Sequence, residues 1–194
     1  QRRIAAFIYD VWHSYSQDNG ETWSTPTVMP DAQGVRVSGY QTEGAMPVIA
    51  ERKEKHLVVV YCSNDGLRYR ISEDGGENWQ VPDPDIISGQ SNNRVRFPTM
   101  AGSDSYISLL YDYVGDDYSP YSRIFDGSEW SEENSVAEGT DSYEGRFSSV
   151  AIDDNKDPIA AWSGVATTWT RGVIFRAGYS DNTWSKWFVA FGDG

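Results

Sequence analysis

The chain contains a single cysteine, Cys62, and only two histidines, His13 and His56, in 194 residues. One cysteine excludes an internal disulfide and every zinc site built from several thiolates, and two histidines are too few for a His-rich metal centre. The acidic segments 115–117 and 153–157 lack the regular ligand spacing of a calcium loop. We therefore expect no metal and no cofactor, and we interpret Cys62 as a small buried core residue.

The sequence also lacks long hydrophobic runs and an excess of positive charge. Its longest apolar runs, 4–8 and 57–60, have the length of a strand, so we expect no membrane insertion. The 16 basic and 29 acidic residues give a net charge of −13. Nucleic acids and anionic membrane surfaces bind basic patches, so this balance argues against both as partners.

No stretch shows the periodicity of an amphipathic helix, whereas β-branched and aromatic residues are plentiful. Aromatic residues make up 14% of the chain, with 8 Trp and 12 Tyr, far more than a disordered chain contains. The apolar residues occur in short runs between turn-forming residues, which is typical of strands. The pattern predicts an all-β chain.

One octapeptide occurs twice: SQDNGETW at 16–23 returns as SEDGGENW at 72–79. Weaker copies end at Trp130, in FDGSEW, and at Trp184, in YSDNTW. The four tryptophans Trp23, Trp79, Trp130 and Trp184 are therefore 56, 51 and 54 residues apart. A period of this length, with several short strands in each unit, indicates the blades of a β-propeller.

The strand pattern supports this interpretation. A pair of strands precedes each repeat, a further strand precedes three of the pairs, and an outer strand follows each tryptophan. These runs predict four-stranded antiparallel blades at about 1–30, 45–84, 96–133 and 146–191 within a single propeller region. The first blade has three strands, RRIAAFIYD paired with VWHSYS and then an outer strand, and it lacks an inner one.

An incomplete first blade leaves sheet edges open, and open edges invite pairing with other strands. Three arrangements would close them: a longer polypeptide, several copies in one ring, or an inner strand from elsewhere. The absence of an initiator Met favours the first. A larger propeller and self-association through the open edges are therefore both expected as arrangements of this chain.

The composition of the octapeptide indicates a structural turn. Ser and Asp side chains accept hydrogen bonds from backbone N–H groups in a tight turn, glycine provides positive φ, and the tryptophan packs between neighbouring sheets. We assign this role to Ser16, Asp18, Gly20 and Trp23, and to Ser72, Asp74, Gly76 and Trp79.

These octapeptides resemble the Asp-box, or BNR repeat, of the sialidase superfamily of β-propellers, and the period extends the resemblance over essentially the whole chain. The resemblance implies an extracellular protein, secreted or at the cell surface. It does not imply one activity, because the family includes sialidases, other glycosidases, lectin-like domains, sorting receptors and scaffolds.

In this family, ligands bind on the face opposite the repeated turn, and the loops expected there contain usable groups. They predict a ring of charged residues at the central channel, flanked by aromatic side chains: Glu43, Arg94, Arg96, Glu144 and Arg146, with Tyr143 and Trp169. An arginine fork suits the carboxylate of a sialic or uronic acid, and Arg96-Phe97-Pro98 resembles the Arg-Ile-Pro element of sialidases. The alternative is that the arginines pair with the glutamates and the aromatic residues pack in the rim.

The resemblance leaves catalysis unassigned. The family pattern requires three arginines, a Tyr–Glu nucleophile pair and an acidic Asp, and Arg96 and Arg146 supply at most two of the arginines. Tyr143 and Glu144 are adjacent on one strand and point opposite ways. A two-carboxylate glycosidase using Glu43 and Glu144 stays open. The sequence thus favours a lectin-like module that binds a carbohydrate, with an acidic sugar as a candidate, over a sialidase-type glycosidase and over a non-catalytic scaffold.

Overall fold

The computed structural model describes residues 7–37, 45–63, 65–88, 95–114, 118–137, 146–167, 170–178, 181–185 and 188–192. All regular elements in these ranges are strands, which confirms the predicted all-β class. The same ranges contain no helix long and apolar enough to cross a membrane. The chain forms two compact units, Gln1–Asn93 and Arg94–Gly194, and how they join into one propeller stays a prediction.

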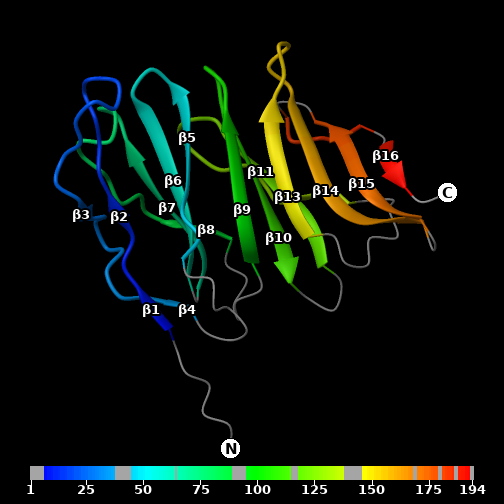
Figure 1. Ribbon diagram of the computed structural model, residues 1–194, viewed down its shortest axis with the longest axis horizontal. Coiled ribbons are helices and arrows are strands. Elements are labelled where there is room, and N and C mark those ends of the chain that lie inside the picture. Colours follow the sequence, from blue (N-terminus) through cyan, green and yellow to red (C-terminus); the bar gives the residue numbers. More distant parts are fainter. Residues whose placement is uncertain are drawn as a thin grey trace, which may run out of the picture. The chain divides into compact units, whose positions relative to one another are not determined.

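The first unit contains a four-stranded antiparallel sheet with the order β5-β6-β7-β8 (Figure 1). Its strands are β5 (Val48–Lys53), β6 (His56–Ser63), β7 (Gly66–Ser72) and β8 (Ile86–Ser88). From Val58 onward β6 is buried at every position. A strand that is covered on both faces has a continuous apolar sequence, which explains the run LVVVYC.

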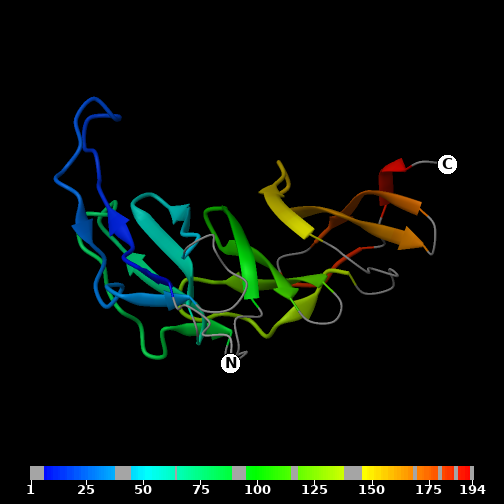
Figure 2. The same ribbon diagram turned by 60° about the horizontal axis from the view of Figure 1, so that its bottom comes forward.

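The second unit contains two such sheets, in which strands consecutive in sequence pair antiparallel. The first has β9 (Val95–Gly102), β10 (Ile107–Val114), β11 (Tyr118–Phe125) and β12 (Asn134–Ser135). The second has β13 (Arg146–Ile152), β14 (Pro158–Thr167), β15 (Thr170–Ala177) and β16 (Phe188–Gly192). Strands β9 and β13 contact each other, and the core between the sheets contains Leu110, Val136, Val150, Ala160 and Trp162 (Figures 1 and 2).

The first repeat differs from the prediction. The runs expected to pair as a hairpin form one extended segment, with β1 (Phe7–Tyr9) followed directly by β2 (Trp12–His13). Strand β1 pairs with β4 (Val35–Val37), and β2 pairs with β3 (Thr27–Val28). The first repeat therefore continues to Val37 instead of ending near residue 30. Its described part consists of two extended chain segments that pair with each other, instead of the three strands that were predicted. The hairpin prediction was wrong because residues 9–12 contain no Gly, Pro or Asn to turn the chain.

Both octapeptides form the same hydrogen-bonded turn. The Ser16 hydroxyl donates to Asp18 at 2.7 Å and accepts the N–H of Gly20 at 2.8 Å, and Asp18 accepts the N–H of Thr22 at 2.8 Å. The second octapeptide repeats these three bonds at 2.8, 2.8 and 2.9 Å. Its two glycines have φ of 80° and 95°, a region that favours glycine.

Two of the four repeat tryptophans, Trp79 and Trp184, reach the sheet before their own, whereas Trp23, which was predicted to pack in the same way, is 64% exposed. The Trp79 indole N–H donates to His13 on β2 at 3.2 Å, and the Trp184 indole N–H donates to Ser122 on β11 at 2.9 Å. The residue after Trp23 donates its N–H to the Tyr15 carbonyl, and the residue after Trp130 donates its N–H to the Ile124 carbonyl. His13 and Ser122 each lie two residues before these carbonyls, so they occupy equivalent positions. The tryptophan thus joins neighbouring sheets in both units.

We predict that Asp74→Asn lowers the melting temperature at neutral pH more than at acid pH. The N–H of Asn78, the Asn78 side chain and the Ser72 hydroxyl lower the pKa of Asp74 from 3.8 to about 2. A carboxylate whose pKa is lower in the folded state stabilises the fold above pH 4, and this contribution is lost as the pH falls toward 2. Thermal unfolding followed by circular dichroism from pH 7 to 2 measures the difference. Glu73→Gln is the matched control, since exposed Glu73 makes none of these turn bonds; equal losses in both variants would contradict the prediction.

Candidate functional site

Strands β5, β9 and β13 each lie at one edge of a four-stranded sheet. The same kind of β-bulge occurs at each of these edges. In the β9 sheet, Leu110 pairs with Thr99 whereas Asp112 pairs with Arg96, so the two residues 97–98 lie opposite Tyr111 alone. The other two sheets repeat this bulge at 147–148 opposite Trp162 and at 46–47 opposite Tyr61. Bulges of this kind redirect the neighbouring side chain and often border functional sites.

Backbone conformation and a proline favour the bulge. Phe97 has a φ of 50° and precedes Pro98, and Met46 has a φ of 44° and precedes Pro47. Proline has no N–H for a ladder hydrogen bond, so it is tolerated at an edge strand or a bulge. The residue before the bulge is Ala45 in the first unit, and it is Arg96 and Arg146 in the second. Two of the predicted arginines therefore occupy equivalent backbone positions on the neighbouring strands β9 and β13.

Arg96 lies at the end of the sheet away from the repeated turn. Strand β9 begins at Val95 and β10 ends at Val114, so both reach the edge that carries the connection 115–117. The turn between β11 and β12 is at the other end. This is the end of the sheet on which ligand loops were predicted.

Arg96 differs from the well-satisfied arginines of the chain. The buried Arg70 donates to Pro30 O at 2.7 Å and to Asp85 at 2.9 Å, and it lies over the Tyr61 ring. Arg176 donates to two backbone carbonyls. The half-buried Arg96 has a buried Nε with no hydrogen-bond partner among the described residues. A buried donor without a partner is costly, so Arg96 is suited to an acceptor from a ligand.

A buried carboxylate stands opposite Arg96. Asp112 on β10 is its register partner, and the Asp112 side chain is fully buried. Directly opposite residues of an antiparallel ladder project from the same face of the sheet. Sequence reasoning missed Asp112, although a charged residue in the otherwise uncharged strand ISLLYDYV was the available signal. Its charge favours an arginine beside it.

The tyrosines of this sheet form a separate cluster. Tyr111 and Tyr121 stack with ring centroids 6.4 Å apart, and by strand alternation they project from the face opposite to Asp112. The Tyr111 hydroxyl donates to Glu133. Burial, and then the Glu133 charge, raise the pKa of Tyr111. The stacked ring of Tyr121 and the bond to Glu133 hold the Tyr111 side chain on that face.

The structure does not describe several of the predicted site residues. Glu43, Arg94, Tyr143, Glu144 and Trp169 lie outside the described residues, as does the acidic segment 115–117; for Arg146, only the backbone is described. In the described ranges, no group of His, Cys, Asp and Glu is arranged to hold a metal ion. The acidic segment 153–157 is a turn in which Asp153 accepts two backbone N–H groups.

Comparison with known proteins finds similarity to sialidases. No protein-family model matches the chain. A sialidase of Paraclostridium sordellii is 34% identical over 73 residues, which are 36% of this chain and 15% of that protein. The solved structures that this chain resembles in fold include a sialidase of Streptococcus pneumoniae (TM-score 0.53, 16% identity, covering 88% of this chain and 26% of that one) and an intramolecular trans-sialidase of Ruminococcus gnavus (TM-score 0.54, 17% identity, 92% and 40%). The chain thus spans well under half the length of these proteins, and it shares its fold with sialidases.

Proposed function

We propose that the chain binds the carboxylate of an acidic sugar through Arg96, as part of a sialidase-type glycoside hydrolase. The observation that carries this proposal is the buried Arg96 Nε without a partner in the described ranges, at the loop end of β9. The fold shared with sialidases supports it. So does a similar trans-sialidase whose structure holds oseltamivir carboxylate, a ligand with a carboxylate group.

The arrangement around Arg96 suits an anion. A guanidinium presents its N–H groups as a planar fork that matches a carboxylate. Asp112 is buried on the neighbouring strand and favours the charged arginine on the same face. Arg146 occupies the equivalent backbone position on β13, and we propose it as a second arginine of this site. Two arginines from adjacent strands would select an acidic sugar over a neutral one.

The proposed architecture is a propeller in which each four-stranded sheet is one blade and β5, β9 and β13 are the innermost strands. The repeated turns are its Asp-boxes. The chain spans 26% and 40% of the two sialidase structures, so we propose hydrolysis for a propeller to which this chain contributes, without assigning the catalytic groups to it. A secreted or cell-surface location, where sialosides are encountered, accompanies this proposal.

Two other functions remain as alternatives. A lectin-like module would use the same arginine to bind an acidic glycan and would release no sugar. A scaffold would bind no glycan, and Arg96 would then have no ligand to satisfy it. The similarity to sialidases favours the hydrolase over the lectin, and the partnerless Arg96 Nε favours either of these over the scaffold.

We predict that Arg96→Ala weakens binding to sialylated glycans by roughly tenfold to a hundredfold, because charge-assisted hydrogen bonds contribute about 1.5 to 3 kcal/mol. A glycan array followed by calorimetry with 3′-sialyllactose measures the loss. Arg52→Ala is the matched control, because Arg52 lies on β5 near the opposite end of its sheet. Equal affinities of wild type and Arg96→Ala, or binding of neutral glycans alone, would refute the arginine site.

We further predict that the wild-type chain binds the methyl ester of the same sialoside more weakly than it binds the free acid. The Arg96→Ala variant should bind the ester and the free acid with the same weak affinity. Esterification removes the charge that the guanidinium recognises while it retains the sugar ring. Competition calorimetry provides the measurement. Release of methylumbelliferone from a fluorogenic sialoside then separates the hydrolase from the lectin, and an ester bound as tightly as the acid would show that the carboxylate is not recognised.

A further inference from the structure

Two contacts between sheets have the same geometry but different hydrogen-bond acceptors. Trp79 donates its indole N–H to Nδ1 of His13 at 3.2 Å, and Trp184 donates its indole N–H to the Ser122 hydroxyl at 2.9 Å. A hydroxyl oxygen keeps its lone pairs in mild acid, whereas an imidazole nitrogen loses its lone pair when it is protonated. The contact at His13 therefore responds to acidity, and the contact at Ser122 does not.

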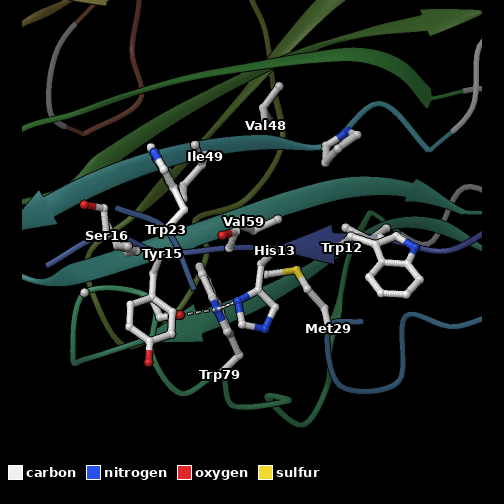
Figure 3. A pocket seen from close by; sticks show the side chains of 16 residues that line it. Trp12, His13, Tyr15, Ser16, Trp23, Met29, Val48, Ile49, Val59 and Trp79 are labelled. Atoms are coloured by element: carbon white, nitrogen blue, oxygen red, sulfur yellow. Dashed lines mark hydrogen bonds between the residues drawn. The ribbon is translucent and has the colours of Figure 1, made fainter. Parts of the chain in front are cut away.

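Both ring nitrogens of His13 take part in hydrogen bonds. Nε2 lies 2.8 Å from the Thr27 hydroxyl on the neighbouring strand β3. Because Nδ1 accepts from Trp79, the proton of the neutral ring lies on Nε2, from which it is donated to Thr27. The His13 and Trp79 rings meet edge to face, with centroids 5.9 Å apart and planes at 69° (Figure 3). One neutral tautomer thus satisfies the bonds at both nitrogens.

Protonation of this ring sets two donors against each other. The Trp79 indole N–H also lies 3.0 Å from the Gly76 carbonyl oxygen, in the second octapeptide turn. A His13 imidazolium carries a new N–H at Nδ1, which points at the Trp79 indole N–H. Two N–H groups cannot bond to each other, so both compete for the Gly76 carbonyl. The bond that joins the two sheets is therefore lost when His13 gains a proton.

The surroundings of His13 favour the neutral ring. Burial lowers the pKa of His13, and the Gly76 carbonyl raises it by less. A histidine whose pKa is lower in the folded state stabilises the fold fully above its ordinary pKa of about 6.5, and this contribution is lost as the pH falls through the folded pKa. The cavity that His13 lines has only apolar side chains from β5 and β6, namely Val48, Ile49, Leu57 and Val59.

The charged groups on the elements around His13 have other roles. Burial and the Gly76 carbonyl, and none of these described groups, shift the pKa of His13. Asp18 and Asp74 close the octapeptide turns, and their pKa values of about 2 keep them ionised in mild acid. The other charged residues of the two turns and of the β5–β6 hairpin are Glu21, Glu73, Glu77 and the segment 51–55, and the titratable Tyr15 lies on the same segment as His13.

We propose that the His13–Trp79 bond is a pH-sensitive switch, which holds β2 against the second octapeptide turn at neutral pH and releases it in mild acid. After protonation, β2 keeps its pairing with β3, whereas its polar bond to the next sheet is broken. The octapeptide turns stay closed because their aspartates remain ionised. Acid therefore loosens one sheet contact selectively, in the first unit and without involving Arg96.

The test is hydrogen exchange of the indole N–H groups in the ¹⁵N-labelled chain at pH 7.5 and pH 5. The ratio of the Trp79 rate to the Trp184 rate should rise about threefold to tenfold in acid, as expected for the loss of one hydrogen bond. The ratio removes the intrinsic effect of pH, because both groups are indole N–H groups. An unchanged ratio would overturn the proposal. So would a ¹H–¹⁵N spectrum of the His13 ring with the proton on Nδ1 at pH 7.5.

Matched variants separate the switch from general acid sensitivity. His13→Ser gives the first contact the acceptor that Ser122 gives the second, so the exchange ratio should no longer depend on pH. Thr27→Val removes the acceptor of the Nε2 proton and frees the other tautomer, so Trp79 exchange should accelerate already at pH 7.5. His56→Gln replaces the other histidine and should leave the pH dependence intact. Each comparison is made within one variant, so a change in overall stability does not affect it. A pH dependence that persists in His13→Ser, or disappears in His56→Gln, would refute the switch.

Discussion

The hydrogen bond that the octapeptide aspartate accepts from the backbone N–H four residues later is the constraint on which the other features depend. It closes the turn between the third and fourth strands of a repeat and thereby fixes where the following tryptophan leaves the sheet. From that point the Trp79 indole N–H reaches His13 of the preceding sheet. Trp184 makes the corresponding bond to Ser122 after a shorter turn, in which Asp181 accepts the N–H of Thr183. A local turn thus determines the spacing of neighbouring sheets, which no single sheet could set by itself.

The terminal strands of these sheets have bulges, and Arg96 and Arg146, which stand before two of the bulges, are the residues proposed to bind a ligand. Ala45, Arg96 and Arg146 share one position before the bulge, so the scaffold is constant while the residue at this position varies. Arg96 lies at one end of its sheet, and the repeated turn between β11 and β12 lies at the other end. The repeated turn and the proposed ligand site therefore lie at different ends of the strands, and a change at one end need not disturb the other.

Local chemistry was predictable from the sequence, whereas pairing across the chain was not. The octapeptide turns and the β6 strand could be predicted because Ser, Asp, Gly and a continuous apolar run act within a few residues. The hairpin expected at 1–16 was wrong because an apolar run does not indicate which segment it pairs with. Asp112 opposite Arg96, and Asp85 bound to Arg70, were missed because a register over many residues brings them together. Aromatic residues named as sugar platforms lie outside the described residues.

Exposed tryptophans such as Trp12 and Trp23 favour association between chains, and the acidic surface of this chain limits that hazard. Copies with a net charge of −13 repel one another. Salt screens this repulsion over a distance of about 10 Å at moderate ionic strength, so it acts mainly when two copies approach closely. Asp18 and Asp74 are among the carboxylates of this surface, so the residues that close the octapeptide turns also add to the charge that keeps copies of the chain apart.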